Sequence, residues 1–284
     1  MQLRGASFAF DDERRRTYVM GVVNVTPDSF SDGGRYLGRE AAIARGRELG
    51  AAGADLLDVG GESTRPGAAP VDAAEEWARI GEVIAALAAL PVPVSVDTYK
   101  AEVAGRALAA GAQVVNDVSG GALDPAILDV AARADAVMVL GHLRGDPRTM
   151  QKEIAFADVF EEVTTELAAV IARARAAGVR RIVADPGLGF GKTAAHNLVL
   201  LGRAGELSDR LGVPVMVGPS RKAFLGQLTG LPVDERGAAT LGSVVAAALR
   251  GAQFVRVHDV APARHALAVA DAVVAAARAS RGAP

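Results

Sequence analysis

The feature that most constrains the fold of this chain is a regular alternation of two kinds of segment. Short runs rich in Val, Ile and Leu recur along the 284 residues, and most are followed by a longer segment with helical spacing of its apolar residues. Continuous apolar runs of this kind are typical of parallel strands, which are buried on both faces. The expected strands are Val19–Val23, Asp55–Val59, Val92–Val96, Gln113–Val115, Ala136–Leu140, Arg181–Ala184, Val213–Val217 and Gln253–Val257.

The segments between these runs have the periodicity of helices. Val71–Leu90 is the clearest, with Asp72 as its expected N-cap, and Glu153–Ala177 and Ala261–Ala279 have similar patterns. Eight strand–helix units in this length predict an α/β fold, a single (β/α)8 TIM barrel, in preference to a doubly wound sheet. We expect residues 1–18 to be a short N-terminal extension, a hairpin that closes the bottom of the barrel, and residues 19–284 to form the barrel of a one-domain protein.

Composition excludes several classes of function. The formal net charge is −2 and the pI is near 6.1, so there is no basic excess for a nucleic-acid or membrane-surface partner. The chain has no cysteine, which rules out disulfides, thiolate catalysis and cysteine-type zinc sites. We find no signal peptide and no unbroken run of about 18 apolar residues. A cytoplasmic protein is therefore expected.

Polar residues follow nearly every expected strand. Because all strand ends meet at one face of such a barrel, these side chains are expected to converge there and to form an active site. Asp58 and Asp117 have an alternative interpretation, since Asp commonly caps the helix that follows a strand. The residues at or just after the strand ends are Asn24, Asp58, Glu62, Asp97, Asn116, Asp117, His142, Asp185, Ser220, Arg221, Lys222, Arg256 and His258.

Two loops are too rich in Gly, Pro, Ser and Asp to belong to a core. The first, Asn24–Gly34, carries Phe30 and Asp32, and the second, Gly60–Gly67, adds a cation. We expect both to be mobile lids over the mouth of the barrel, although a plain surface turn is the alternative for the first.

Asp97, Asn116 and Asp185 suggest recognition of a heterocycle. Two carboxylates and an amide can accept from and donate to the hydrogen-bonding edge of such a ring. A metal site is the competing interpretation, because hard cations also prefer oxygen ligands. The ammonium of Lys222 is expected nearby and disfavours a metal there, so we favour ring recognition.

Two glycine-containing turns complete the expected site. Gly191-Lys192-Thr193 resembles part of a P-loop, but the position that needs the first glycine holds Pro186, so we expect a glycine-rich loop that holds Phe190 near substrate. Packing of Phe190 on the barrel rim is the alternative. Gly218–Lys222 joins a strand to a helix, where backbone N–H groups favour anions. We expect a phosphate site there, formed by Ser220 and Arg221 with Arg256 and His258 of the last strand.

These motifs resemble those of the dihydropteroate synthase family. The resemblance covers roughly residues 19–260. It implies a transferase of folate biosynthesis that condenses 6-hydroxymethyl-7,8-dihydropterin pyrophosphate with p-aminobenzoate, giving 7,8-dihydropteroate and pyrophosphate. The matching segments, in chain order, are MGVVNVTPDSFSDGG, DVGGESTRPGA, VSVDT, VVNDVSGG, DPGLGFGKT, GPSRKAFLG and VRVHDV.

The resemblance also implies roles for individual residues and a homodimer formed through outer helices. The pterin would be bound by residues at Asp97, Asn116, Asp185 and Lys222. The pyrophosphate would be bound by Asn24, Ser220, Arg256 and His258, with Mg²⁺ bridging it to Asn24. The p-aminobenzoate would lie beside Thr64, Arg65, Pro66, Phe190 and Lys222.

The chemistry of these residues agrees with that reaction. Loss of pyrophosphate beside an electron-rich ring would leave a cationic pterin, which Asp97 and Asp185 would stabilise, while Arg256, His258 and Mg²⁺ would stabilise the leaving group. The chain departs from the family at Gly141, where many members have a Met against the pterin. It also departs at Ala223, where many have a Ser.

Three alternatives to a drug-sensitive synthase remain at this stage. A pterin-binding methyltransferase domain would not need the anion site. A non-catalytic pterin-binding paralogue would be expected to have degraded lid loops. A sulfonamide-insensitive form of the same enzyme is the third.

Overall fold

The computed structural model describes residues 1–3, 5–10, 16–25, 34–63, 70–145, 149–151 and 154–280. Its centre is an eight-stranded parallel sheet in which neighbours follow the order β8-β7-β6-β5-β4-β3-β10-β9. A parallel bridge between Ala184 and Val215 joins the two ends of this order and closes the barrel. The strands are β3 (Tyr18–Asn24), β4 (Leu56–Gly60), β5 (Val94–Asp97), β6 (Val114–Asp117), β7 (Val137–Gly141), β8 (Arg181–Asp185), β9 (Met216–Val217) and β10 (Phe254–Val257).

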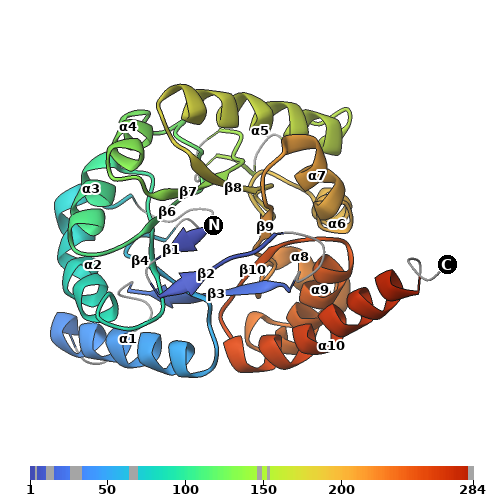
Figure 1. The fold of residues 1–284 in the computed structure, drawn as a ribbon, viewed down its shortest axis with the longest axis horizontal. Helices are drawn as coiled ribbons and strands as arrows, with labels where there is room; N and C mark the ends of the chain where they lie inside the picture. Colours follow the sequence, from blue (N-terminus) through green and yellow to red (C-terminus); the bar gives the residue numbers. More distant parts are fainter. Residues whose placement is uncertain are drawn as a thin grey trace.

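Helices surround the strands on the outside, as Figure 1 shows. Their buried faces pack on the outward side chains of the strands and form the larger of two apolar clusters. The predicted barrel is therefore confirmed, and all eight expected strands are present. The helices are α1 (Gly34–Ala51), α2 (Ala73–Leu87), α3 (Ala101–Ala109), α4 (Ala126–Arg133), α5 (Val159–Ala176), α6 (Ala194–Gly202), α7 (Ala204–Leu211), α8 (Ala223–Thr229), α9 (Gly237–Leu249) and α10 (Val260–Ala279).

The N-terminal hairpin closes one end of the barrel. Its strands β1 (Gln2–Leu3) and β2 (Ala6–Ser7) are antiparallel and cross the centre of the ring in Figure 1. Phe8, which is 2% exposed, follows the hairpin and packs on Tyr18 and Phe254, at ring-centroid distances of 4.8 and 5.6 Å. We call this end of the interior the floor. Its other inward side chains are Met20, Leu56, Val114, Val137, Val139, Val183 and Met216.

Several elements, among them α5 and β9, are shorter than the sequence predicts. Helix α5 begins at Val159 and not at Glu153, because the Asp158 carboxylate accepts hydrogen bonds from the N–H groups of Phe160 and Glu161 and so caps the helix there. Strand β9 has two residues because Pro214 precedes it and has no N–H to donate. The carbonyl of Pro214 still accepts a hydrogen bond from the N–H of Ala184 at 2.8 Å.

Helix α10 has the length and hydropathy of a membrane-spanning helix, although no charge-free apolar run was evident in the sequence. Its hydropathy comes largely from alanine. Val260, Ala263, Leu267 and Ala270 are buried, and the helix packs on α9 and β3. This is the packing of an outer barrel helix.

Candidate active site

The end of the barrel opposite the floor, which we call the mouth, is polar. Side chains alternate along a strand, so residues two apart share a face. On the inward face, Val114 of the floor is followed by Asn116, and Val183 is followed by Asp185. Phe254 is followed in the same way by Arg256. Each of these three strands therefore changes from an apolar to a polar side chain over two residues.

Arg256 forms the centre of a buried cluster at the mouth. Its Nε donates to Asp58 Oδ2 at 2.6 Å, and its Nη2 donates to Asp97 Oδ2 at 2.6 Å. The amide of Asn116 donates to the same oxygen of Asp58 at 2.9 Å, which fixes its orientation. Asp97 and Asn116, which the sequence predicts to lie together, are thus connected through Arg256 and Asp58, although the sequence predicts Arg256 in the phosphate site with Ser220 and His258.

Asp58 and Asp117, which the sequence left open between capping and function, have different roles. Both side chains are fully buried. Asp117 accepts from the N–H groups of Ser119 and Gly121, at 2.8 and 2.6 Å, and so orders the turn after β6. Asp58 caps nothing and contacts only site residues, and its Oδ1 has no hydrogen-bond partner in the part of the chain that the structure describes. Asp58 therefore belongs to the site, although it was not among the residues assigned to a substrate.

Asp185 and Lys222 lie on the other side of the mouth. Asp185 Oδ1 accepts from the N–H of Gly187 at 2.7 Å. The Lys222 ammonium donates to the carbonyl of Leu188 in the same loop. Its Nζ is 4.7 Å from the centre of the Phe190 ring, so the predicted proximity of Phe190 and Lys222 is observed.

Ser220 and His258 form a second polar pair at the mouth. Ser220 Oγ is 2.9 Å from His258 Nδ1 and accepts from the N–H of His258 at 3.2 Å. A hydroxyl, an imidazole and a guanidinium from adjacent segments are groups that bind phosphate oxygens.

Arg221 does not join this pair, contrary to the prediction from sequence. Its Nη2 donates to both carboxylate oxygens of Asp259, at 3.0 and 2.8 Å, so the guanidinium is engaged there. The backbone explains the difference, because Arg221 has φ +58°, in the left-handed region. Its N–H donates to Thr240 Oγ1 at 3.1 Å, which holds this conformation and leaves Ser220 and Lys222 facing the site.

Burial shifts the pKa values of the charged groups at the mouth. It raises the pKa of Asp97 to about 7, with Arg256 opposing the shift. It raises the pKa of Asp185 as well, against the effect of Lys222. It lowers the pKa of Lys222 to about 8, although Asp185 favours the ammonium. Burial disfavours charge on Arg256 too, but Asp58 and Asp97 outweigh it and raise its pKa.

Of the remaining residues assigned to a substrate or to the lid loop, the structure describes only Asn24. Asn24 ends β3 with a half-buried side chain, in register with Gly60 of β4, which is in register with Asp97. Five residues lie outside the described part of the chain: Phe30 and Asp32 of the first loop, and Thr64, Arg65 and Pro66 of the second.

Gly141 faces the interior at the mouth end of β7. A Cβ there would lie 2.5 Å from the carbonyl oxygen of Val118, so the backbone of the turn after β6 occupies the place of a side chain. The neighbouring Met138 and Leu140 point outward and pack among the helices. Neither fills the space that a side chain at position 141 would occupy.

Comparisons with known proteins agree with this geometry. The model of the family "Pterin binding enzyme" matches residues 20–258. The dihydropteroate synthase of Synechocystis is 46% identical over 266 residues, which is 92% of this chain and 92% of that protein. The chain belongs to the dihydropteroate synthase family. Its activity is that of a dihydropteroate synthase, a transferase of folate synthesis.

Further relatives of the family extend the comparison. The mitochondrial folate synthesis bifunctional protein of Arabidopsis thaliana is 39% identical, and the chain spans 50% of its length. The dihydropteroate synthase of Xanthomonas albilineans with 4-aminobenzoic acid superposes with a TM-score of 0.85 at 45% identity, covering 95% of this chain and 94% of that one. The same enzyme with 7,8-dihydropteroate gives a TM-score of 0.82 at 43% identity, covering 95% of each chain.

Proposed function

We propose that the mouth of the barrel condenses 6-hydroxymethyl-7,8-dihydropterin pyrophosphate with p-aminobenzoate. The carbon–oxygen bond to pyrophosphate breaks, a carbon–nitrogen bond to the aromatic amine forms, and the amine loses a proton. The observation that carries the proposal is the position of β10, which joins two different sites. Arg256 belongs to the carboxylate and amide cluster, and His258, two residues later, belongs to the pair with Ser220.

The carboxylate and amide cluster suits the pterin ring. The carboxylates of Asp97 and Asp185 accept hydrogen bonds from the ring N–H groups, and Asn116 and Lys222 bind its other polar atoms. As pyrophosphate leaves, positive charge spreads from the methylene carbon into the ring. Asp97 and Asp185 are then the nearest stabilising charges, and the buried mouth strengthens their effect.

The Ser220 and His258 pair suits the leaving pyrophosphate, with Arg256 as its cation and Asn24 on the facing strand. The described residues could supply only part of a coordination shell for Mg²⁺ at this position. The described residues contain no group of three His, Asp or Glu side chains that could hold a metal by themselves. Mg²⁺, however, commonly binds through one protein oxygen together with substrate phosphates and water. Asn24 would hold it against the pyrophosphate, where it would neutralise negative charge.

The p-aminobenzoate site is proposed beside Phe190 and Lys222, with Thr64, Arg65 and Pro66 from the second loop. The ring of Phe190 offers an apolar face, and the position of Lys222 lies between this face and the Asp185 carboxylate. Phe30 and Asp32 of the first loop are proposed to cover the site, so that the amine and not water attacks the pterin carbon.

One assay tests the proposal. Purified protein with the pterin pyrophosphate, Mg²⁺ and p-aminobenzoate is expected to form dihydropteroate and to release an equal amount of pyrophosphate. Absence of both products would favour a non-catalytic pterin-binding paralogue. Omission of Mg²⁺ with added chelator is expected to lower the rate, and an unchanged rate would remove the metal from the proposal.

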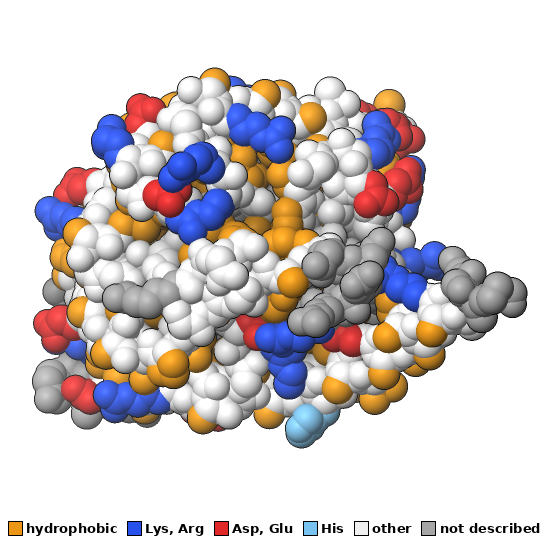
Figure 2. Space-filling view, viewed as in Figure 1, with side chains coloured by type: hydrophobic (Ala, Val, Ile, Leu, Met, Phe, Trp, Pro, Cys, Tyr) orange, Lys and Arg blue, Asp and Glu red, His pale blue; other side chains and the backbone are white. Residues whose placement is uncertain are grey.

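We also propose a homodimer that works in the cytoplasm. Apolar side chains are exposed along α10 in Figure 2, and Val269 and Val273 of this helix are 66% and 53% exposed. Leu249 of the neighbouring α9 is 46% exposed. An exposed apolar face of this kind is typical of an interface between subunits. Light scattering on the purified protein is expected to give twice the chain mass, and Val269→Glu is expected to give the monomer.

A further inference from the structure

Side chains hold several backbone groups of the loop that carries Phe190. The N–H of Gly189 donates to Asn197 Oδ1 at 2.7 Å, and its carbonyl accepts from Gln151 at 2.7 Å. Lys222 binds the carbonyl of Leu188, and Lys192 donates to the carbonyl of Phe190 at 3.0 Å. The loop is therefore fixed from two sides, although its glycines permit many conformations.

Two lysines, Lys192 and Lys222, bind carbonyl groups of this loop. The side chain of Lys192 is buried, at 4% exposed. Besides the carbonyl of Phe190, its Nζ lies 2.9 Å from His142 Nδ1 and 3.5 Å from the carbonyl of His142. Burial lowers the pKa of Lys192 to about 7, and these three contacts direct its Nζ at the loop and at His142 rather than at a substrate.

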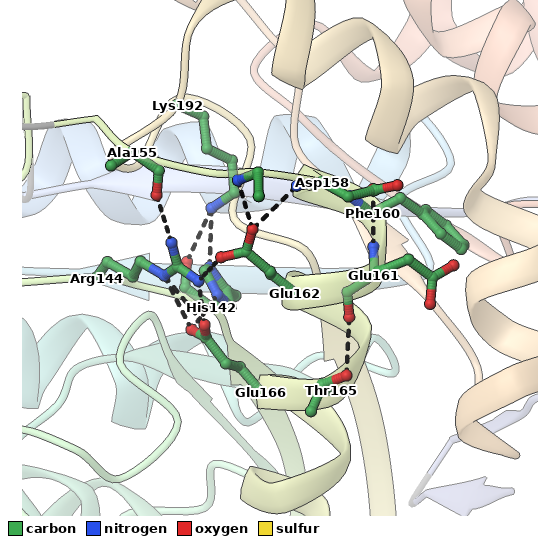
Figure 3. Close-up of polar contacts among 11 residues, drawn as sticks. His142, Arg144, Ala155, Asp158, Phe160, Glu161, Glu162, Thr165, Glu166 and Lys192 are labelled. Carbon is green, nitrogen blue, oxygen red and sulfur yellow. Dashed lines mark hydrogen bonds and ion pairs between the residues drawn. The ribbon is translucent and has the colours of Figure 1, made fainter.

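His142 is itself held by a hydrogen bond to Glu166, which in turn forms an ion pair with Arg144, as Figure 3 shows. Its Nε2 lies 2.9 Å from Glu166 Oε2 on α5, and Arg144 Nε donates to Glu166 Oε1 at 3.0 Å. Burial lowers the pKa of His142 to about 4, so the ring is neutral at pH 7. Nε2 then carries the proton toward Glu166, and Nδ1 accepts from Lys192. This arrangement connects helix α5 to the Phe190 loop.

We propose that Lys192 is a positioning residue for p-aminobenzoate: it holds the carbonyl of Phe190 against His142 and so keeps the Phe190 ring beside Lys222. The inference rests on the proposed p-aminobenzoate site. Two of the residues proposed for the pterin, Asp97 and Asn116, lie on other strands and are held by Arg256 and Asp58. Asp185 precedes the Phe190 loop, but its carboxylate is held by the N–H of Gly187, so we expect loss of Lys192 to affect p-aminobenzoate more than the pterin.

The test compares variants of Lys192 in steady-state kinetics. Lys192→Met keeps the length of the side chain and removes every donor. We expect its KM for p-aminobenzoate to rise about tenfold, with the KM for the pterin pyrophosphate within about twofold of the wild type. Lys192→Arg keeps a charged donor and is expected to recover part of the loss, with a rise of about threefold.

Thr164→Val is the matched control. Thr164 is also buried, on α5, and its hydroxyl donates to the carbonyl of Phe160 at 2.6 Å without reaching the loop. We expect it to lower the melting temperature and to leave both KM values unchanged. An equal rise of both KM values in Lys192→Met, or no rise for p-aminobenzoate, would overturn the inference. If Lys192→Met does not fold, Lys192→Arg decides in the same way.

A second readout does not depend on turnover. Labelling with para-fluorophenylalanine gives fluorine resonances for the eight phenylalanines, and Phe190→Leu assigns the one from Phe190. We expect that resonance to shift in Lys192→Met and to stay in place in Thr164→Val. An unchanged resonance would contradict the positioning role. Failure of the wild type to make dihydropteroate would instead contradict the proposed function, so the two failures are distinguishable.

Discussion

The two ends of the barrel interior are built from the same strands and have opposite properties. At the floor, Leu56, Val114 and Phe254 pack on Phe8 of the hairpin. At the mouth, two residues later on the same strands, Asp58, Asn116 and Arg256 bond to one another. Burial of apolar side chains stabilises the fold at the floor. Burial of charges at the mouth costs stability and creates groups with shifted pKa values. The floor therefore stabilises the fold, and the mouth of the same barrel carries the groups that take part in chemistry.

The largest expected effect is loss of activity at the mouth. Lys222→Ala removes a cation between the pterin and the amine and is expected to lower kcat/KM by at least about a thousandfold. The melting temperature should stay close to that of the wild type, because the side chain contributes little apolar packing. Near-normal turnover would remove Lys222 from the proposed pterin site.

The next effect is loss of stability at the floor. Phe8→Ala leaves a cavity beneath the barrel and is expected to lower the free energy of unfolding by about 3–5 kcal/mol. Denaturant titration measures this change. The kcat/KM of the folded fraction is expected to be unchanged at a low temperature, and Phe8→Leu should keep most of the stability. A proportional loss of kcat/KM would show that the two ends are not independent.

A smaller effect separates two buried carboxylates at the mouth. Asp58→Asn weakens the bond to Arg256 and releases the amide of Asn116, so kcat/KM is expected to fall about a hundredfold. Asp117→Asn is the matched control, since the hydrogen bonds of the Asp117 carboxylate go to Ser119 and Gly121 of the turn after β6. It is expected to cost about 1–3 kcal/mol of stability with kcat/KM within a few-fold of wild type. Equal kinetic losses would contradict the distinction between them.

The smallest effect is a dependence of kcat/KM on pH. Asp97 acts as a carboxylate, and its pKa is raised to about 7, so activity is expected to increase about tenfold per pH unit up to that value. Lys222 acts as an ammonium, and its pKa is lowered to about 8, so activity is expected to fall above that value. The optimum is then narrow and lies between the two. Asp97→Asn should flatten the acid limb of the profile, and a profile with the same acid limb would assign it to another group.

The sequence predicts the barrel well because each strand is an apolar run that ends in a polar residue. It also brings Asp97 and Asn116 to one place, because strand ends in a barrel converge. It does not separate Asp58 from Asp117, since an aspartate after a strand caps a turn or enters a site with equal ease. That choice depends on whether Arg256 or a backbone N–H lies within reach of the carboxylate, which is a property of the barrel's stagger.

Other differences have local causes. The left-handed backbone of Arg221 depends on Thr240, far along the chain, so the bond of its side chain to Asp259 has no sequence signal. Lys192 lies in a segment that resembles a nucleotide-binding loop, and rejection of that motif left it without a role. The start of α5 was predictable, because Asp158 is followed three residues later by Glu161, a pattern that often begins a helix.

The contact between Gly141 and Val118 limits how this site can vary over evolutionary time. A side chain at position 141 meets the backbone of another turn, so no single substitution there is tolerated until that turn has moved. A side chain can thus be introduced at position 141 only after changes at residues 118–121 have moved that turn. An inhibitor designed to contact Gly141 and Val118 would contact main-chain atoms, which a point mutation does not replace.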